Sequence, residues 1–465
     1  MIRGRWAAPA AIFGGVLLGY ANSFFGAFQF DDYNVIVLNP SVHSLAAWFS
    51  GLPAGIRPLL KLTYALNLAS GMGLFGFHLF NAAVHAANAL FVYALSRRLL
   101  GGSAGAAGDP ATAGALAAAM LFAVHPVQTE AVTYVSGRSV SLMAFFYLAS
   151  LWSYARGAET GRRIHLYLVS PLLFLLALAT RESAVTLPAA LLLWELAAPG
   201  PCGRPAAVAR KQAAHWVILA CAIAAVLLHP VYRHILGSGY SSVAPGHLLP
   251  QAVHGAFYLS SRLFLPHRLN IDPDLRIPPS GYWLVAAEGA ALAALFALGI
   301  RALRKYPPAG FGILWFFLQL LPTNSVIPSP DVANERHLYL ACWGIFLCAG
   351  RGIGRLEAAG VPRRRWVPAA ASAALLLAVL TIARNHAYRS EVALWESTAR
   401  LSPAKARAHN NLGYAYQLSG MRAKAIESYR EALRLDAGFR LARGNLEALL
   451  REERPARGVK GRAGR

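Results

Sequence analysis

Long apolar runs dominate this chain and constrain its fold more than any other feature. A bilayer core about 30 Å thick requires about 20 mostly apolar residues per crossing helix. The composition agrees, because 56% of the residues are hydrophobic and only 14% are charged, whereas a soluble chain carries about 25% charged residues. We therefore expect an all-α, polytopic membrane protein with about eleven transmembrane helices and exclude soluble enzyme architectures. The expected spans cover about 7–27, 77–96, 111–126, 140–155, 164–180, 183–198, 213–230, 282–300, 309–327, 337–350 and 366–384.

The basic residues predict how these spans are oriented. The net charge is +23, but most Arg and Lys residues sit in short loops between apolar runs, a pattern that reports topology and not a nucleic-acid partner. A further run at about 248–265 is ambiguous, since Ser260, Ser261 and Arg262 interrupt it. If it does not cross, five basic clusters gather on one side, which the positive-inside rule makes the cytoplasm. We therefore predict an interfacial helix at 248–265 on the outer face.

With that topology the outer face receives the segments 28–76, 125–139, 181–182, 231–281 and 322–336, and everything after about 385. The abundance of Arg, Ala, Leu and Gly is typical of a GC-rich bacterial genome. The expected location is therefore a bacterial inner (cytoplasmic) membrane, with the lipid bilayer as a partner. The first span, at about 7–27, is too long for a signal-peptide core and is expected to remain as an anchor.

Motifs for metals and nucleotides are missing from the sequence. The four cysteines lack CxxC spacing, Cys202 falls in a loop, and the histidines lack ligand spacing such as HExxH. No disulfide framework, metal site or other cofactor is indicated. No P-loop or GxGxxG motif occurs, so a nucleotide-fuelled reaction is not expected.

The end of the chain carries a different signal. Residues 406–439 fit the 34-residue tetratricopeptide pattern, in which small residues let two antiparallel helices approach closely and aromatic residues fill the space between them. Trp395 and Pro403 fit the second half of a preceding repeat, and 440–451 fits a capping helix. The matching residues are Leu412, Gly413, Tyr416, Gly420, Ala425, Tyr429 and Ala432.

The domain organisation follows from these two signals. We expect a membrane domain at 1–385, a repeat module at 386–451 and a disordered basic tail at 452–465. The repeat module either forms a groove for a polypeptide or stabilises the membrane domain as an appendage.

Two adjacent carboxylates, Asp31 and Asp32, follow the first apolar run. Acidic residues at a membrane boundary are costly to bury without partners, so they are functional candidates. A carboxylate beside a like charge and apolar walls has a raised pKa and can act as a general base toward a hydroxyl. A helix cap is the alternative, because Asp is favoured at helix N-termini. We favour the catalytic role, since other polar groups are expected on the same face.

Further candidates for substrate binding lie on that face. An Arg at the outer boundary suits a phosphate, because a planar guanidinium can donate paired hydrogen bonds to it. Arg138 and Arg181 are the phosphate candidates, although Arg181 can instead pair with a carboxylate or extend to the surface. His125 is equally well explained as a structural residue in a Pro-containing turn. The remaining candidates are Glu130, Glu182, Glu335 and Arg336.

Taken in order, these segments resemble a known family, the transmembrane and tetratricopeptide-repeat proteins related to protein O-mannosyltransferases. Those proteins belong to the C superfamily of membrane glycosyltransferases (GT-C). The resemblance covers essentially the whole chain, and several of its motifs are long and specific. The matching stretches are FDDYNVIVLNPSV at 30–42, RPLLKLTYALNLASGMGLFGFHLFNAAVHAANAL at 57–90, LFAVHPVQTEAVTYVSGRS at 121–139, RESAVTLPAALLLWEL at 181–196 and NERHLYL at 334–340.

The resemblance implies a function. Asp31 and Asp32 would be catalytic, and the donor would be a sugar such as mannose linked through phosphate to a polyprenyl lipid. The sugar would pass with inversion to a hydroxyl of a protein. Two positions depart from the family pattern. Gln128 replaces the second His of the family's HPVHTEAV stretch, and Val140 stands where an acidic residue is common after GRS. The repeat array is also shorter than in the animal members, which leaves the acceptor and the sugar open.

Two rival functions remain at this stage. An enzyme of the same superfamily can glycosylate a lipid or a cell-surface glycan, although the repeat module argues against this. A non-catalytic scaffold or transporter can recruit partners through its repeats. A transporter should place charges at the bilayer midplane and show inverted repeats, whereas here the polar residues gather at one face.

Overall fold

The described part of this computed structural model is entirely helical, which confirms the all-α prediction. It covers residues 6–53, 55–102, 109–199, 204–242, 245–324 and 333–451, so Cys202 and the expected tail at 452–465 lie outside it. The helices are α2 (Ala7–Tyr20), α3 (Leu45–Ser50), α4 (Pro58–Ala69), α5 (Gly73–Leu99), α6 (Pro110–Val124), α7 (Thr129–Val132), α8 (Arg138–Thr160), α9 (Ser170–Thr180), α10 (Leu187–Ala197), α11 (Pro205–Leu228), α12 (Pro230–Ser242), α13 (Pro245–Phe264), α14 (Tyr282–Lys305), α15 (Pro307–Leu320), α16 (Leu338–Ala358), α17 (Arg363–Asn385), α18 (Glu391–Leu401), α19 (Ala406–Leu418), α20 (Arg422–Leu435) and α21 (Arg440–Arg451).

Each of the eleven apolar runs coincides with a helix or a helix pair in this order. Among the described residues, five helices are long and apolar enough to cross a membrane: Ala7–Phe25, Gly73–Leu99, Pro205–Leu228, Tyr282–Lys305 and Arg363–Tyr388. A sixth span results if Pro110–Val124 and Pro126–Val132, bent by 52°, count as one. The chain is thus a multi-pass membrane protein, while the full number of eleven crossings stays a prediction.

Helix α16 lies at the centre of the bundle, between α6 and α15. Glycines make both contacts close: a Cβ atom at Gly344 would lie 2.0 Å from the carbonyl oxygen of Gly312 on α15, and one at Gly350 would lie 2.2 Å from that of Gly114 on α6. Lipid gives apolar helices no hydrophobic reason to associate, so close backbone approach at small residues is a main source of their packing energy.

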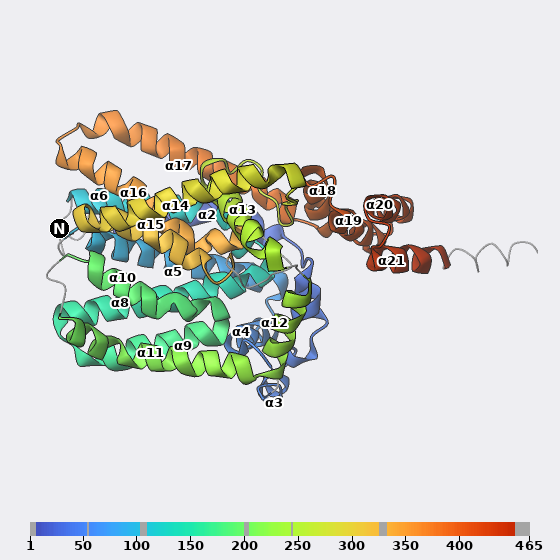
Figure 1. The fold of residues 1–465 in the computed structure, drawn as a ribbon, viewed down its shortest axis with the longest axis horizontal. Helices are drawn as coiled ribbons and strands as arrows, with labels where there is room; N and C mark the ends of the chain where they lie inside the picture. Colours follow the sequence, from blue (N-terminus) through green and yellow to red (C-terminus); the bar gives the residue numbers. More distant parts are fainter. Residues whose placement is uncertain are drawn as a thin grey trace, which may run out of the picture.

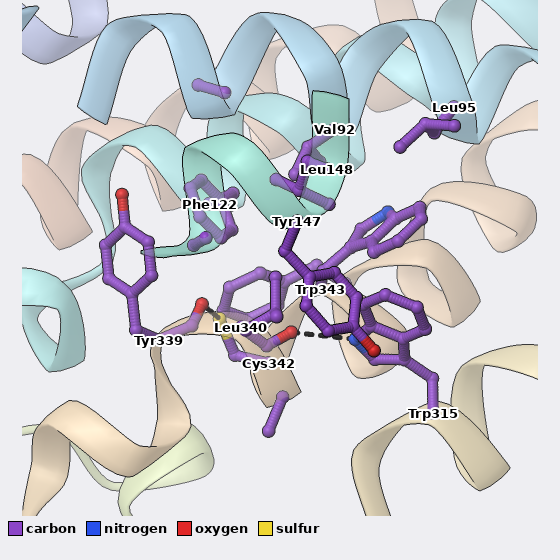
Figure 2. Close-up of a cluster of buried hydrophobic side chains, with 14 of the residues drawn as sticks. Val92, Leu95, Phe122, Tyr147, Leu148, Trp315, Tyr339, Leu340, Cys342 and Trp343 are labelled. Carbon is purple, nitrogen blue, oxygen red and sulfur yellow. Dashed lines mark hydrogen bonds between the residues drawn. The ribbon is translucent and has the colours of Figure 1, made fainter. Parts of the chain in front are cut away.

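Aromatic side chains fill the space around this helix (Figure 2). The ring centroids of Trp315 and Trp343 are 4.5 Å apart, and the Trp315 indole N–H donates to the Leu340 carbonyl oxygen over 2.8 Å. Both indoles are buried. A buried indole usually needs such an acceptor, so this bond also fixes the register of α15 against α16.

The polar loops gather at the end of the bundle that carries the repeat module. The first described residues lie at one end, while α18 to α21 extend beyond the opposite end (Figure 1). The ambiguous run forms α13, which packs against α14 and is not among the candidate spans. Its assignment to the membrane interface stays a prediction.

The repeat module is held by its own small core. Gly413 packs against the Tyr429 ring, where an added Cβ atom would lie 2.7 Å from the ring carbons. Trp395 of α18 joins this core together with Ala408 and Ala425. α18 supplies the second helix of the preceding half-repeat, and α21 follows where a capping helix is expected.

The glycine contacts of α16 generate the first prediction. Gly344→Ala places a methyl group against the α15 backbone and should destabilise the bundle by about 1–3 kcal/mol, the usual cost of overpacking. Gly352→Ala is the matched control, because Gly352 lies on the same helix and nothing surrounds its missing Cβ. Thermal melting in detergent should show a lower Tm for Gly344→Ala alone. Equal melting of the two variants would contradict the close contact.

Candidate active site

The acidic pair sits in a tight turn after the first helix. The turn closes through a 2.8 Å hydrogen bond from the Asp32 N–H to the Gln29 carbonyl oxygen. The buried Asp32 carboxylate accepts the Gln29 N–H over 3.0 Å, the Ser136 N–H over 2.8 Å and the Ser136 hydroxyl. No N–H of the helix that follows Asp32 donates to its side chain. The carboxylate therefore does not cap that helix but ties the turn to the loop before α8.

Burial changes the acidity of Asp32. It raises the pKa of this carboxyl to about 7, and the neighbouring charge of Asp31 acts in the same direction, while the hydrogen bonds from Ser136 and Gln29 oppose it. Desolvation disfavours a charged carboxylate, and donors to it favour the charge. Asp32 therefore changes its charge near neutral pH, unlike an ordinary surface aspartate.

Asp31 is the more accessible member of the pair, because it is only partly buried. Its N–H donates to the Tyr134 hydroxyl over 3.0 Å, and Tyr134 itself is buried. Burial, Asp32 and Asp31 raise the pKa of the Tyr134 hydroxyl, whereas the charge of Arg336 lowers it. Tyr134 thus lies between the acidic pair and a cation from another part of the chain.

Arg181 keeps the features of a phosphate ligand. Its guanidinium donates to the Ser139 hydroxyl over 2.8 Å and, within the described residues, has no carboxylate at ion-pair distance. Burial and the nearby charges of Arg57 and Arg336 lower its pKa to about 9, although Glu182 and Glu130 oppose them. Since Glu182 pairs with Arg57 and Glu130 lies beside Arg336, Arg181 is the cation of this group that is available to an added anion.

Glu182, in contrast, is fully engaged with other parts of the chain. Arg57 donates to both of its oxygens, with Nε to Oε1 at 2.9 Å and Nη2 to Oε2 at 2.8 Å, and the Tyr232 hydroxyl donates to Oε1 at 2.5 Å. Burial alone would raise the pKa of Glu182, but Arg57 holds it at about 2. Glu182 therefore joins the start of α4 to α12 as a permanent anion, which gives it a structural role in this conformation.

Arg138 does not meet the expectation that it contacts phosphate. The guanidinium is completely buried, and it donates to the Asn81 side-chain oxygen over 2.7 Å and to the Phe77 carbonyl oxygen over 3.1 Å. It also stacks on Phe80, with 4.4 Å between the guanidinium carbon and the ring centroid. Its remaining donor group and another of its contacts go to Thr63 and Tyr64 of α4, so in this structure Arg138 holds α8 against α5 and α4.

His125 likewise shows the structural role that was weighed against binding. Its Nδ1 accepts the Val127 N–H over 3.2 Å, and its Nε2 lies 3.2 Å from the Leu263 carbonyl oxygen of α13. Because the first bond needs an unprotonated Nδ1, the second requires the proton on Nε2. His125 therefore shapes the Pro126 turn and fastens α13 to it.

Two buried acids and two arginines complete this end of the bundle. Glu130 accepts the Arg336 N–H over 3.0 Å and lies 3.6 Å from its guanidinium. Glu335 accepts the Asn270 N–H and lies 3.6 Å from Arg384, and burial raises its pKa to about 7. Glu130 and Glu335 thus orient the cations and the outer loop.

Sequence reasoning missed several residues that build this site. Ser136, Tyr134 and Arg384 carry contacts described above, and Arg57 was likewise not among the predicted site residues. The one available signal was Arg384, a cation in the last turn of α17 that follows a long apolar run and lies at the predicted outer face. In the described part of the chain, no three His, Cys, Asp or Glu side chains are grouped as metal ligands.

Comparison with known proteins bears on this arrangement. The tetratricopeptide repeat model matches residues 406–439. The chain is 27% identical to the protein O-mannosyl-transferase TMTC4 of Mus musculus over 89% of this chain and 64% of that protein. It is 26% identical to the protein O-mannosyl-transferase Tmtc3 of Drosophila melanogaster over 90% of this chain and 54% of that protein. It is 24% identical to the protein O-mannosyl-transferase TMTC1 of Homo sapiens over 97% of this chain and 57% of that protein. No solved structure matches the chain.

The matched region includes nearly all of this chain, but the chain spans only about half to two thirds of the curated relatives' length. The resemblance stated from the motifs is nevertheless confirmed. By its sequence and its repeat, the chain is a relative of the transmembrane and tetratricopeptide-repeat proteins that are named protein O-mannosyl-transferases.

Proposed function

We propose that the protein is a membrane glycosyltransferase that moves a hexose such as mannose from a polyprenyl-phosphate carrier to a hydroxyl of a protein, with inversion. The observation that carries the proposal is the turn at 29–32, where a partly exposed carboxylate lies next to a buried one at the polar end of the bundle. The names of the relatives support transfer of mannose to protein. No nucleotide, metal or other cofactor enters the reaction as proposed.

Asp31 is assigned as the base that meets the acceptor, because it is the partly exposed member of the pair. The acceptor oxygen attacks the anomeric carbon, the bond from that carbon to the phosphate oxygen breaks, and the hydroxyl proton passes to Asp31. In-line attack inverts the anomeric centre. The lipid phosphate leaves as a stable anion, so no general acid is required.

Asp32 supports this step without direct contact with the acceptor. As an anion it holds the turn through Ser136 and Gln29, and its charge makes Asp31 more basic. Replacing either carboxylate should therefore reduce transfer, for different reasons.

Arg181 and Arg336 are assigned to the phosphate of the carrier. Charge grows on the phosphate oxygen as the sugar leaves, and guanidinium groups already in place stabilise it without reorganisation. Arg181 has the Ser139 hydroxyl as its neighbour, and Glu130 orients Arg336. Arg138, whose donors are used by α5 and α4, contributes by holding α8 in place.

The repeat module is assigned to the polypeptide acceptor. A cleft on it is lined by Leu412, Tyr416, Ile426, Lys424 and Arg430, a mixture of apolar and charged side chains suited to an extended peptide. Sugar transfer to a lipid or glycan, without glycosylation of acceptor peptides, would favour the alternative enzyme. No sugar transfer to any acceptor would favour the non-catalytic scaffold.

Substitution of the acidic pair tests the chemistry. Asp31→Asn should lower kcat by about 10²–10⁴-fold, the usual worth of a general base. Asp32→Asn should also lower it, since the amide cannot supply the charge. Transfer of radiolabelled sugar from the polyprenyl-phosphate donor to a peptide measures both, with Asp109→Asn as a control distant in the sequence at the α6 N-cap. Full activity of the Asp31/Asp32 double variant would rule out the assignment.

The pH dependence follows from the raised pKa of Asp32, about 7 against an ordinary 3.8. Below that pKa the carboxyl is neutral. The rate of transfer should therefore fall about tenfold per pH unit below pH 6 and stay constant above pH 8. The groups facing Asp32 are Asp31 beside it, Tyr64 of α4, Tyr134 and Arg138. Asp31→Asn removes a like charge, so the midpoint of its residual activity should move to lower pH.

Orientation is the remaining part of the proposal. The positive-inside distribution assigns the acidic pair and the repeat module to the extracytoplasmic side of a bacterial inner membrane. Alkaline phosphatase fused after Arg451 should be active. A fusion after Arg98, at the end of α5 that is predicted to face the cytoplasm, should be inactive. The reverse pattern would contradict both the orientation and the interfacial assignment of 248–265.

A further inference from the structure

The turn that carries the acidic pair contains a strained residue. Phe30 has φ +47, in the left-handed region, and only one other non-glycine residue of the described chain, Arg57, has positive φ. Left-handed backbone costs a side-chain-bearing residue about 1–2 kcal/mol. Such a conformation persists only where the surroundings hold it, so the contacts of Phe30 identify what fixes the turn.

Those contacts come from the repeat module. The Phe30 N–H donates to Oε1 of Glu391 over 3.2 Å. The Phe30 ring meets the Trp395 indole edge to face, with 5.3 Å between centroids and 74° between planes. Just before it, the Gln29 side-chain amide donates to the Tyr388 carbonyl oxygen. The strained residue therefore packs into the core of the repeat module, although it belongs to the membrane domain.

A helix can position a turn only if the helix itself is fixed. Ser390 caps the start of α18 by accepting the Ala393 N–H over 3.1 Å, which is favourable at this position. Glu391 then occupies the first turn, where the helix dipole also favours an acid. Trp395 lies one turn further along, on the same face.

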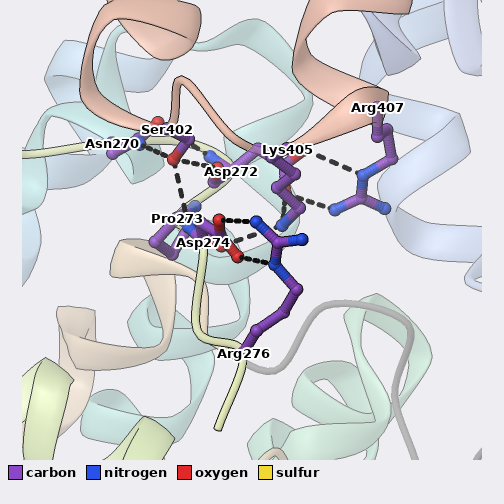
Figure 3. Close-up of polar contacts among 8 residues, drawn as sticks. All are labelled: Asn270, Asp272, Pro273, Asp274, Arg276, Ser402, Lys405 and Arg407. Carbon is purple, nitrogen blue, oxygen red and sulfur yellow. Dashed lines mark hydrogen bonds and ion pairs between the residues drawn. The ribbon is translucent and has the colours of Figure 1, made fainter. Parts of the chain in front are cut away.

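The far end of α18 is fastened to the membrane domain as well (Figure 3). Asp272 of the segment after α13 accepts from Lys405 and Arg407, and the Asn270 amide donates to the Ser402 hydroxyl over 2.8 Å. Asp272 is buried, so this double ion pair is shielded from salt. α18 is thus held at both ends, which fixes its distance from Phe30.

We propose that Glu391 and Trp395 are positioning residues for transfer, which hold Phe30 so that the repeat module sets the geometry of Asp31 and Asp32. This inference rests on the proposed function of the acidic pair. It means that the module does more than collect acceptors: the membrane domain alone would keep the contact of Asp32 with Ser136 but lose the contacts that hold Phe30. A peptide bound against α19 and α20 would then touch the same core that holds Phe30.

Three variants of the full chain test the proposal. Glu391→Ala removes the acceptor for the Phe30 N–H, while Glu391→Gln keeps an acceptor oxygen at the same place and should rescue function. Glu396→Ala is the matched control, because Glu396 lies on the same helix and accepts the Tyr416 hydroxyl over 2.7 Å inside the module. Loss of that bond removes a contact between α18 and α19 and leaves the contacts of Phe30 with Glu391 and Trp395 in place.

The first readout does not depend on activity. Hydrogen exchange followed by mass spectrometry should show amides 29–33 exchanging about tenfold faster in Glu391→Ala, the effect of losing about one hydrogen bond. The same amides should exchange as in the parent chain in Glu391→Gln and Glu396→Ala. Unchanged exchange in Glu391→Ala, or equal acceleration in Glu396→Ala, would overturn the positioning role even if transfer is established.

The second readout is kinetic. Glu391→Ala should lower kcat by about 10-fold to 100-fold, the effect of misplacing a reacting group, with KM for the lipid donor within about twofold because Arg181 is untouched. The loss of its activity at acid pH should begin at a lower pH than in the parent chain, since a looser turn hydrates Asp32 and lowers the pKa of its carboxyl. A change in KM alone, with kcat and the pH dependence of transfer as in the parent chain, would overturn the proposal. Absence of transfer in the parent chain would refute the proposed function, while the exchange result would still decide the role of Glu391.

Discussion

The hydrogen bonds between the Asp32 carboxylate and Ser136 join the two parts of the chain on which the candidate site depends. Residue 32 follows the first helix, and residue 136 precedes α8, so the bond closes a loop of more than a hundred residues. Helix α5 packs against both α2 and α8, the helices nearest to these two residues. The carboxylate loses water in this packing and regains only three donors, which is why its pKa stays high instead of falling. Burial of the Asp32 carboxylate thus accounts both for its hydrogen bonds with Ser136 and for its titration near neutral pH.

The sequence predicted the all-helical fold well, because apolar runs and tetratricopeptide spacing are local patterns. It also predicted that Asp31, Asp32 and Arg181 share the outer face, since topology follows from the charges of short loops, and this shared face stays a prediction. The roles of individual arginines were harder to predict. Arg138 and Arg181 each lie at the boundary of an apolar run. Arg138 donates to Asn81 and Phe77 of α5, whereas within the described residues the side-chain hydrogen bond of Arg181 goes to Ser139. Such partners lie far away in the sequence, and no local pattern reveals them.

The same difficulty applies to acids. Glu182 looked like a ligand because it lies beside Arg181, but Arg57 and Tyr232 occupy it. Arg57 reaches Glu182 from a left-handed backbone at the start of α4, a conformation that composition and periodicity do not predict. The two strained non-glycine residues of the described chain, Phe30 and Arg57, therefore flank the same site. Strain of this kind is retained where surrounding contacts over-determine the geometry.

These contacts also bear on why a short repeat array is sufficient here. A solenoid of one and a half repeats leaves one flank without a neighbouring repeat, and an uncovered flank is unstable. In this protein Phe30 and Ile271 of the membrane domain cover the flank formed by α18, and Asp272 neutralises Lys405 and Arg407, which follow α18. The membrane domain thus replaces the missing repeat. Because the covering surface contains the turn of the acidic pair, the contacts that stabilise the module also help to order the site.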